Sequence, residues 1–217
     1  MKTGILFDLD GTLLDTLEDL WNAVNYALEQ FGCPARTLEE VRAFVGNGAG
    51  LLIQRALPGG KNDPDWQAVL AVFRAYYDAH CRERTRPYPG ILEMLAVLRA
   101  QYPLAVVSNK PDSAVKQLCR VYFGDIFARG EDGDCPRKPA PDMLYQAMEA
   151  LGAERCIYVG DSEVDVETAR NAEMPCLSVL WGFRDVRCLE QAGAKHFCRL
   201  PIELPAAIAK MEEAYGK

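Results

Sequence analysis

The sequence predicts an α/β fold in which a doubly wound, Rossmann-like parallel sheet carries an inserted all-helical cap domain. Short apolar runs alternate with helical patterns over residues 86–217, as expected where helices connect parallel strands. Residues 17–84 interrupt this alternation with helical patterns and contain no strand pattern. Polar residues follow directly after several of the apolar runs, at the edge where open α/β sheets bind their ligands.

The predicted strands are short apolar runs, which is the pattern of strands buried inside a parallel sheet. They lie at residues 4–7, 104–107, 156–159 and 176–180, with weaker candidates at 126–129 and 194–197. Helical patterns connect them at residues 91–101, 112–122, 141–151, 164–171 and 186–192. This order of elements predicts the doubly wound sheet.

The predicted cap consists of four helical patterns, at residues 17–31, 38–45, 50–56 and 65–82. Chain breakers separate them, at Gly32 and Pro34, at Gly46-Asn47-Gly48 and at Pro58-Gly59-Gly60. The chain returns to the sheet near residues 86–90. We therefore predict an α/β core made of residues 1–15 and 86–217, and a helical cap made of residues 16–85.

Composition argues against several classes of partner. The chain of 217 residues is 49% hydrophobic and 25% charged, as is usual for a globular protein with a sizeable core. Its net charge of −7 argues against nucleic acid or an anionic membrane surface as a partner.

We expect no signal peptide, because Asp8 and Asp10 interrupt the first apolar run. We also expect no membrane span, since no stretch approaches roughly 20 apolar residues.

The eight cysteines lie far apart and form no C-x-x-C pair. This spacing indicates thiols in a reducing compartment and neither a disulfide framework nor a zinc site. We therefore expect a cytoplasmic protein. The sequence leaves a monomer and a homodimer equally open.

The segment 8–16 carries the strongest chemical signal. Asp8 and Asp10 follow the first apolar run and would share one face if the strand continued, while Gly11 lets the chain turn. Two carboxylates this close repel each other unless a cation lies between them, and Mg²⁺ prefers such oxygen ligands. For an isolated pair, the plain alternative is an acidic strand end without a catalytic role.

Further polar residues follow the later strands or lie between them. They are Ser108, Asn109, Lys138, Asp161 and Asp165. Since the carboxyl ends of parallel strands meet at one edge of a sheet, we expect these side chains to gather around one crevice.

These residue types suit phosphoryl transfer, which requires a nucleophile, countercharge for the phosphate oxygens and an acid for the leaving alkoxide. Asp8, held at the end of a strand, is the better nucleophile, since carboxylates form aspartyl-phosphate intermediates. Asp10 can protonate the leaving oxygen and later deprotonate the attacking water. Ser108 can bind the phosphate oxygens, and Lys138 can both neutralise Asp8 and bind the phosphate.

Asp161 and Asp165 can hold Mg²⁺ directly or through water. Plainer alternatives stand beside these roles. Serine is common in turns, so Ser108 alone can be a turn residue, and Lys138 alone can be a solvated surface lysine. Asp165 can instead stabilise the start of a helix through the helix dipole.

Taken together, the motifs resemble those of the haloacid dehalogenase superfamily of hydrolases over nearly the whole chain. Motif I corresponds to residues 8–12, motif II to Ser108, motif III to Lys138 and motif IV to residues 160–165. Their order along the chain matches the superfamily, and the resemblance implies a capped hydrolase.

The same resemblance implies roles for the acidic residues. Asp8 would be the nucleophile and Asp10 the general acid and base. Mg²⁺ would be bound by Asp8, the backbone carbonyl of Asp10 and Asp161, with Asp165 supporting the site. The expected product is inorganic phosphate.

Residues 15–20, 45–49 and 108–111 resemble the corresponding segments of phosphoglycolate phosphatases. In that group a glycine-rich cap loop closes over a small substrate, which makes 2-phosphoglycolate the leading candidate among small phosphate esters. The likeness implies that Asn109 and Lys110 lie beside the phosphate or at the junction of cap and core.

Three alternatives remain open at this point. A phosphomutase of the β-phosphoglucomutase type and a pyrophosphatase would share the fold and the nucleophile. A receiver-like signalling module would also carry an aspartyl phosphate without being an enzyme. Asp10 argues against the receiver, because a receiver needs no acid to protonate a leaving alcohol.

Overall fold

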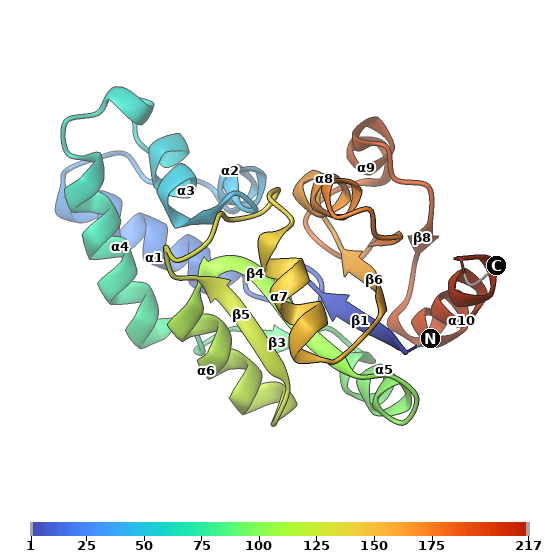
Figure 1. Cartoon of the computed structure of the whole chain (residues 1–217). Coiled ribbons are helices and arrows are strands. Elements are labelled where there is room, and N and C mark those ends of the chain that lie inside the picture. Colours follow the sequence, from blue (N-terminus) through green and yellow to red (C-terminus); the bar gives the residue numbers. More distant parts are fainter. Residues whose placement is uncertain (1, 216–217) are drawn as a thin grey trace.

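The computed structural model describes residues 2–215 and contains a parallel sheet of six strands. The strand order is β5-β4-β1-β6-β7-β8, with β1 in the interior of the sheet (Figure 1). The strands are β1 (Thr3–Phe7), β4 (Leu104–Pro111), β5 (Phe127–Glu131), β6 (Arg155–Gly160), β7 (Cys176–Val179) and β8 (Phe197–Cys198). Every pairing within this sheet is parallel.

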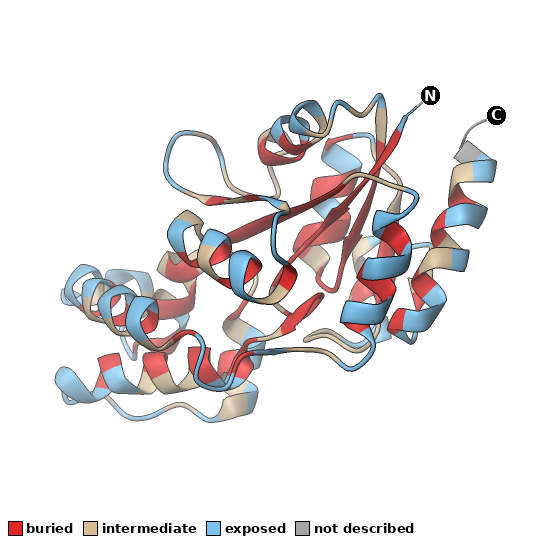
Figure 2. Ribbon diagram, turned by 90° about the horizontal axis from the view of Figure 1, so that it is seen from below, coloured by how far each residue is buried: buried red, intermediate tan, exposed pale blue. Residues whose placement is uncertain are grey.

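Helices cover both faces of the sheet, and alternate residues of each strand pack against them. In β1, Ile5 and Phe7 belong to one apolar cluster and Leu6 belongs to the other, as the period of two in a strand requires. Both faces of the central strands β1, β4 and β6 are largely buried, while the surrounding helices expose their outer sides (Figure 2). The helices are α5 (Ile91–Arg99), α6 (Asp112–Phe123) and α10 (Leu204–Tyr215) with the first cluster, and α7 (Asp142–Ala150) and α8 (Glu163–Asn171) with the second.

Residues 16–85, called the helical insertion below, contain four α-helices between β1 and β4. They are α1 (Leu17–Gln30), α2 (Leu38–Phe44), α3 (Gly48–Ala56) and α4 (Trp66–His80), with a short 3₁₀ turn η1 (Gly60–Asn62). The chain leaves and re-enters the core through an antiparallel pair, β2 (Leu14–Asp15) and β3 (Arg86–Pro87). The Asp19 carboxylate of α1 accepts hydrogen bonds from the backbone N–H groups of Arg84 and Thr85, at 3.0 and 2.8 Å. These contacts tie both ends of the helical insertion together.

The predicted fold class is confirmed, and so is the absence of strands from residues 17–84. The edge strand expected at residues 194–197 was misplaced, since β8 consists of Phe197 and Cys198, each paired with one residue of β7. The pair β2–β3 and the helix α10 were not predicted. Two-residue strands lack a periodic pattern, and their existence depends on a partner that lies far away in the sequence.

Two smaller elements complete the described chain: the helix α9 (Val186–Ala192), which matches its predicted range, and the 3₁₀ turn η2 (Pro201–Glu203). Within residues 2–215, none of the helices combines the length and the apolar character needed to cross a membrane.

Candidate active site

The carboxyl ends of β1, β4 and β6 and the helical insertion enclose a cavity of about 50 Å³. Six of the seven predicted site residues line it: Asp8, Asp10, Ser108, Asn109, Lys138 and Asp161. The seventh, Asp165, contacts the cavity-lining Lys138. The fold therefore brings together residues from near the N-terminus, such as Asp8, and residues as far along the chain as Asp165.

Asp8 and Lys138 form a buried ion pair at the end of β1. Lys138 Nζ lies 2.7 Å from Asp8 Oδ1, and the side chains are 3% and 8% exposed. Burial raises the pKa of Asp8 to about 7, although the neighbouring Lys138 ammonium group acts in the opposite direction. An oxygen of Asp8 is thus held at the cavity wall by a fixed positive charge.

Lys138 also contacts two groups that sequence reasoning did not connect with it. Its ammonium group donates to Asp165 Oδ1 and to the hydroxyl of Tyr158, each at 2.8 Å. Tyr158 in turn donates to Asp165 Oδ1 at 2.8 Å. Burial opposes the charge of Lys138, but Asp165 and Asp8 outweigh it and raise the pKa of the ammonium group. The lysine therefore remains charged, and its ammonium group donates to Asp8, Tyr158 and Asp165.

Asp165 makes two sets of contacts: it caps the start of α8, and it binds Lys138. Its Oδ2 accepts from the backbone N–H and the hydroxyl of Ser162, at 3.0 and 2.6 Å. Ser162 and Asp165 form a reciprocal capping box. Although burial acts against it, Lys138 lowers the pKa of Asp165. Of the two explanations that the sequence left open, the helix start is therefore observed, and the same carboxylate also binds Lys138 at the cavity.

Asp161 lies at the end of β6 and is 1% exposed. Its Oδ1 accepts from the hydroxyl of Thr12 at 3.1 Å, and its Oδ2 accepts from the backbone N–H of Phe183 at 2.7 Å. Burial, followed by the charges of Asp165 and Asp8, raises the pKa of Asp161. The two neutral donors therefore offset only part of the cost of a charged Asp161 at this position.

The carboxylates of Asp8, Asp161 and Asp165 approach within 4.8 Å of one another. Lys138 is the cation that pairs with this group, at Asp8 and Asp165, so the cluster carries more negative than positive charge. Burying such an excess is costly unless a cation joins it. Hard oxygen donors in a buried, acidic site are the donor set that Mg²⁺ prefers, so the residues present fit this ion.

Two glycines allow the backbone to approach Asp161. A Cβ added at Gly182 would overlap Asp161 Cβ and Oδ2 and the carbonyl oxygen of Gly11. Gly11 itself has a φ of +87° and also abuts the Asp161 carboxylate. Asp161 is therefore packed between two turns that accept no side chain.

We predict that Gly182→Ala destabilises the protein by about 1–3 kcal/mol, the usual cost of forcing extra volume into a packed site. The measurement is the free energy of unfolding in urea. Gly50→Ala is the matched control, since a Cβ at that position of α3 meets nothing within 4 Å. In a helix it should stabilise by about 0.5–1 kcal/mol. Equal stability of the two variants would contradict this prediction.

Asn109 joins three parts of the site. Its side-chain amide donates to the carbonyl oxygen of Lys138 at 2.9 Å and to that of Gly46 at 3.1 Å. Its Oδ1 accepts from the backbone N–H of Lys138 at 2.8 Å. Asn109 thereby fixes the backbone of Lys138 and contacts the loop between α2 and α3 of the helical insertion. Ser108, which precedes it in β4, is 2% exposed and lines the same cavity.

Asp10 forms a second buried ion pair. Lys110 Nζ lies 2.8 Å from Asp10 Oδ2 and also donates to the hydroxyl of Tyr77 at 2.7 Å. Tyr77 belongs to α4 of the helical insertion and is 3% exposed. Asp10 Oδ1 is buried and accepts no hydrogen bond from the side chains and backbone of residues 2–215. Although burial opposes it, Asp10 followed by Tyr77 raises the pKa of Lys110.

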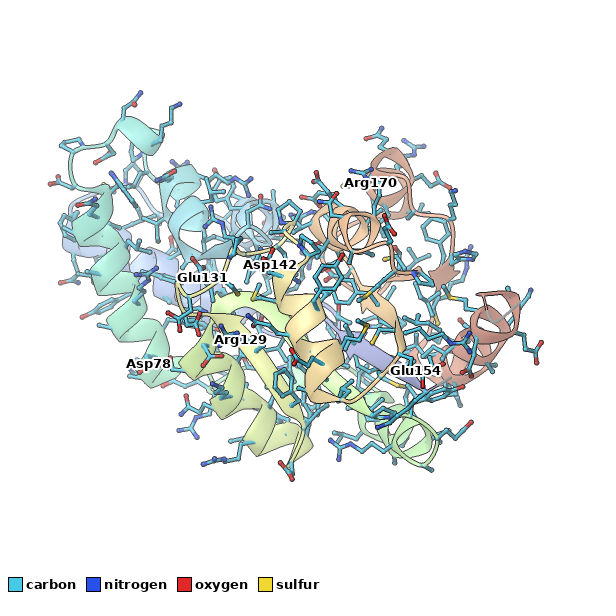
Figure 3. The ribbon with its side chains drawn as sticks, viewed as in Figure 1. Asp78, Arg129, Glu131, Asp142, Glu154 and Arg170 are labelled. Atoms are coloured by element: carbon cyan, nitrogen blue, oxygen red, sulfur yellow. The ribbon has the colours of Figure 1, made fainter. Side chains whose placement is uncertain are left out.

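The loop between α2 and α3 also contacts the core through Arg184. The guanidinium group donates to the carbonyl oxygens of Arg42 and Val45, at 2.9 and 2.6 Å. It pairs with Glu163 of α8 at 2.8 Å. Figure 3 shows Glu131 at the end of β5, on the side that faces the helical insertion, where a Cβ added at Gly48 would lie 3.0 Å from its Oε2. The insertion thus closes directly over the ends of the strands.

Sequence reasoning did not assign site roles to several residues that the structure places there: Thr12, Tyr77, Tyr158 and Arg184. It expected Lys110 beside the phosphate or at the junction of cap and core, but did not connect it with Asp10 or Tyr77. A weak signal existed for Tyr158, the one polar-tipped residue in an otherwise apolar run. Tyr77 and Arg184 had no such signal, because helices and loops of this chain contain many residues of their types.

A protein-family model and several known proteins match most of this chain in sequence. The sequence model of the haloacid dehalogenase-like hydrolases matches residues 5–179. The phosphoglycolate phosphatase of Pseudomonas putida is 36% identical over 198 residues, which cover 86% of this chain and 72% of that protein. The phosphoglycolate phosphatase of Mesorhizobium japonicum is 34% identical over 214 residues, which cover 92% and 93% of the two chains.

Solved structures agree with the sequence relatives. A crystal structure from Lactobacillus delbrueckii subsp. bulgaricus superposes with a TM-score of 0.88 at 39% identity, covering 96% of this chain and 99% of the other. The structure of CbbY from Rhodobacter sphaeroides in complex with phosphate superposes with a TM-score of 0.76 at 28% identity. It covers 94% of this chain and 96% of the other.

Proposed function

The chain belongs to the haloacid dehalogenase-like hydrolases and is a phosphatase, and we propose that Asp8 is the nucleophile with which it hydrolyses a small phosphate ester. The observation that carries this assignment is the position of Asp8, at the end of β1 with one oxygen held by Lys138 at 2.7 Å. A nucleophile must be rigid and aimed at the cavity for in-line attack. The ion pair keeps Asp8 fixed while it lines that cavity.

In the proposed first step, Asp8 attacks the phosphorus atom and the bond to the leaving oxygen breaks. Asp10 gives its proton to that oxygen, so that an alcohol leaves and an aspartyl phosphate remains. In the second step, Asp10 takes a proton from water, and the resulting hydroxide attacks the phosphorus atom. Inorganic phosphate leaves, and Asp8 and Asp10 return to their starting forms.

Ser108 and Lys138 are the proposed ligands of the phosphate oxygens. Both line the cavity together with Asp8, and both are nearly fully buried. In such a site, a preorganised lysine and hydroxyl group stabilise the negative charge that develops on the phosphate oxygens during phosphoryl transfer. Asn109 contributes by fixing the backbone of Lys138.

We propose Mg²⁺ as the cofactor, held by Asp8, the backbone carbonyl of Asp10 and Asp161. When bound, the ion would neutralise charge on the phosphate and on the acidic cluster. Asp165 supports the site by holding Lys138, since both of its oxygens already accept hydrogen bonds from Lys138, Tyr158 and Ser162.

We propose 2-phosphoglycolate as the substrate and residues 16–85 as a cap domain over a core of residues 1–15 and 86–217. The cavity volume of about 50 Å³ is far below the roughly 300 Å³ at which pockets for drug-sized ligands begin. This small volume favours a small ligand. The relatives named phosphoglycolate phosphatase, which match over most of the chain, support this choice.

The test is phosphate release from 2-phosphoglycolate, pyrophosphate and several sugar phosphates, each with Mg²⁺ and with EDTA. We expect turnover of 2-phosphoglycolate to exceed that of the others at least tenfold and to disappear in EDTA, with full recovery when excess Mg²⁺ is added. Unchanged turnover in EDTA would contradict the metal assignment.

The same panel separates the alternatives. Preference for pyrophosphate would contradict the substrate and retain the mechanism. Phosphate release from a monoester without a bisphosphate activator argues against a phosphomutase. Absence of turnover for every ester, with a stable phosphoprotein as the product, would favour the receiver-like module.

A further inference from the structure

We infer that Lys110 is a positioning residue for Asp10, and that Tyr77 of the helical insertion anchors Lys110. The inference rests on the proposed role of Asp10 as general acid and base. It concerns two side chains that do not contact the nucleophile Asp8 through any hydrogen bond found within residues 2–215.

The burial of Lys110 requires an explanation. Its side chain is 2% exposed, and lysine is almost never fully buried unless it is paired. The task of neutralising Asp8 already belongs to Lys138, which lies 2.7 Å from it. Lys110 instead pairs with Asp10 at 2.8 Å. Lys110 therefore pairs with the proposed acid Asp10, whereas Lys138 pairs with the proposed nucleophile Asp8.

The pair decides which oxygen of Asp10 is available for proton transfer. The torsion that orients a carboxylate is broad and roughly two-fold, so the backbone alone does not fix it. Lys110 occupies Oδ2, and Oδ1 is buried without a hydrogen-bond partner among residues 2–215. Since Asp10 lines the cavity, Oδ1 is the oxygen left for the leaving group and the attacking water.

The leaving group of the ester reports on the alignment of Asp10, because the need for an acid depends on the leaving group. An alkoxide leaves poorly unless it is protonated, whereas a phenolate with electron-withdrawing groups leaves well without help.

Tyr77 determines where the ammonium group lies. Its hydroxyl accepts from Lys110 Nζ at 2.7 Å, and its ring centroid lies 4.6 Å from the same nitrogen. A flexible lysine side chain has several rotamers, and the buried phenol selects the one that reaches Asp10. The phenol comes from α4, so the helical insertion contributes to the alignment of an acid that lies on the core.

The experiment compares Lys110→Met and Tyr77→Phe with the native protein on two kinds of ester. One is the best alkyl phosphate of the substrate panel, and the other is p-nitrophenyl phosphate. We expect kcat for the alkyl ester to fall about 10–100-fold in Lys110→Met and about 3–10-fold in Tyr77→Phe, within the 10²–10⁴-fold contribution of general acid catalysis. For p-nitrophenyl phosphate we expect changes of less than about threefold, and KM should change little for either ester.

Asp10→Asn is the reference, and Tyr76→Phe and Lys116→Met are the matched controls. Tyr76 neighbours Tyr77 on α4 but stacks on Tyr26, and Lys116 lies on the surface of α6, 59% exposed. Both controls should behave as the native protein on both esters. Lys110→Arg, which keeps a charged donor, should recover part of the alkyl activity.

The outcomes separate this inference from the proposed function. If Asp10→Asn loses alkyl turnover selectively while Lys110→Met and Tyr77→Phe do not, the acid stands and the positioning role is overturned. If Lys110→Met raises KM and slows both esters equally, Lys110 binds the substrate instead. If Asp10→Asn itself shows no dependence on the leaving group, the proposed mechanism fails. Should Lys110→Met fail to fold, Tyr77→Phe still decides the question.

Discussion

Asp8→Asn is expected to lower phosphate release by about 10⁴-fold or more, the scale seen when a nucleophile is removed from a catalytic unit. The amide keeps the size of the carboxylate but cannot form the acyl phosphate. In-line attack then has no protein nucleophile, whatever else binds the substrate. Steady-state phosphate release on the best ester of the panel measures the effect.

The same substitution should leave the fold intact. It removes one negative charge from a cluster in which Asp8, Asp161 and Asp165 lie within 4.8 Å, and Lys138 keeps its contact with Asp165 at 2.8 Å. We therefore expect a Tm no lower than that of the native protein. Asp142→Asn is the matched control, because Asp142, the first residue of α7 (Figure 3), does not line the cavity. Turnover of Asp8→Asn within tenfold of the native rate would falsify the nucleophile assignment.

Lys138→Met is expected to damage both activity and stability. Removing one partner of a buried ion pair leaves the other charge uncompensated and costs about 3–5 kcal/mol. Here two carboxylates lose their partner, Asp8 at 2.7 Å and Asp165 at 2.8 Å. Unfolding in urea measures the loss of stability, and phosphate release should fall at least about 10²-fold, the effect of losing one group that stabilises the transition state.

A second substitution separates the two losses. Adding Asp165→Asn to Lys138→Met removes one of the stranded charges and should recover part of the unfolding free energy without restoring turnover. The surface variant Lys116→Met should change stability by no more than about 0.5 kcal/mol. A single Lys138→Met variant as stable as the native protein would show that the buried pair does not hold the site together.

The sequence predicted the sheet well because each strand carries its own apolar pattern. Residues 104–107 and 156–159 are continuous apolar runs. The first run lies within β4 and the second within β6. The edge of the sheet was predicted less well. β8 consists of two residues that pair with β7, and the run at 194–197 includes Lys195 and His196, so its pattern is weak. An edge strand depends on its neighbour more than on its own sequence.

The site residues named from the sequence lie together because their order follows the strands. Asp8, Ser108 and Asp161 each lie at or beyond the carboxyl end of a parallel strand, and such ends meet at one edge. Asp165 shows the limit of this reasoning. The sequence left it between a helix start and a metal site, and the structure shows it bonded to both Ser162 and Lys138. Its second partner comes from a segment 27 residues away.

By itself, the sequence determined the fold class, the helical segment between β1 and β4 and the seven predicted site residues, six of which line one cavity. These depend on local periodicity and on short motifs. Only the tertiary structure decided which charges pair. Lys110 meets Asp10 across 100 residues and Tyr77 across 33, while Lys138 meets Asp8 across 130. Such pairings follow from strand order and helix packing, because a buried ammonium group is tolerated only where the whole fold supplies its partners.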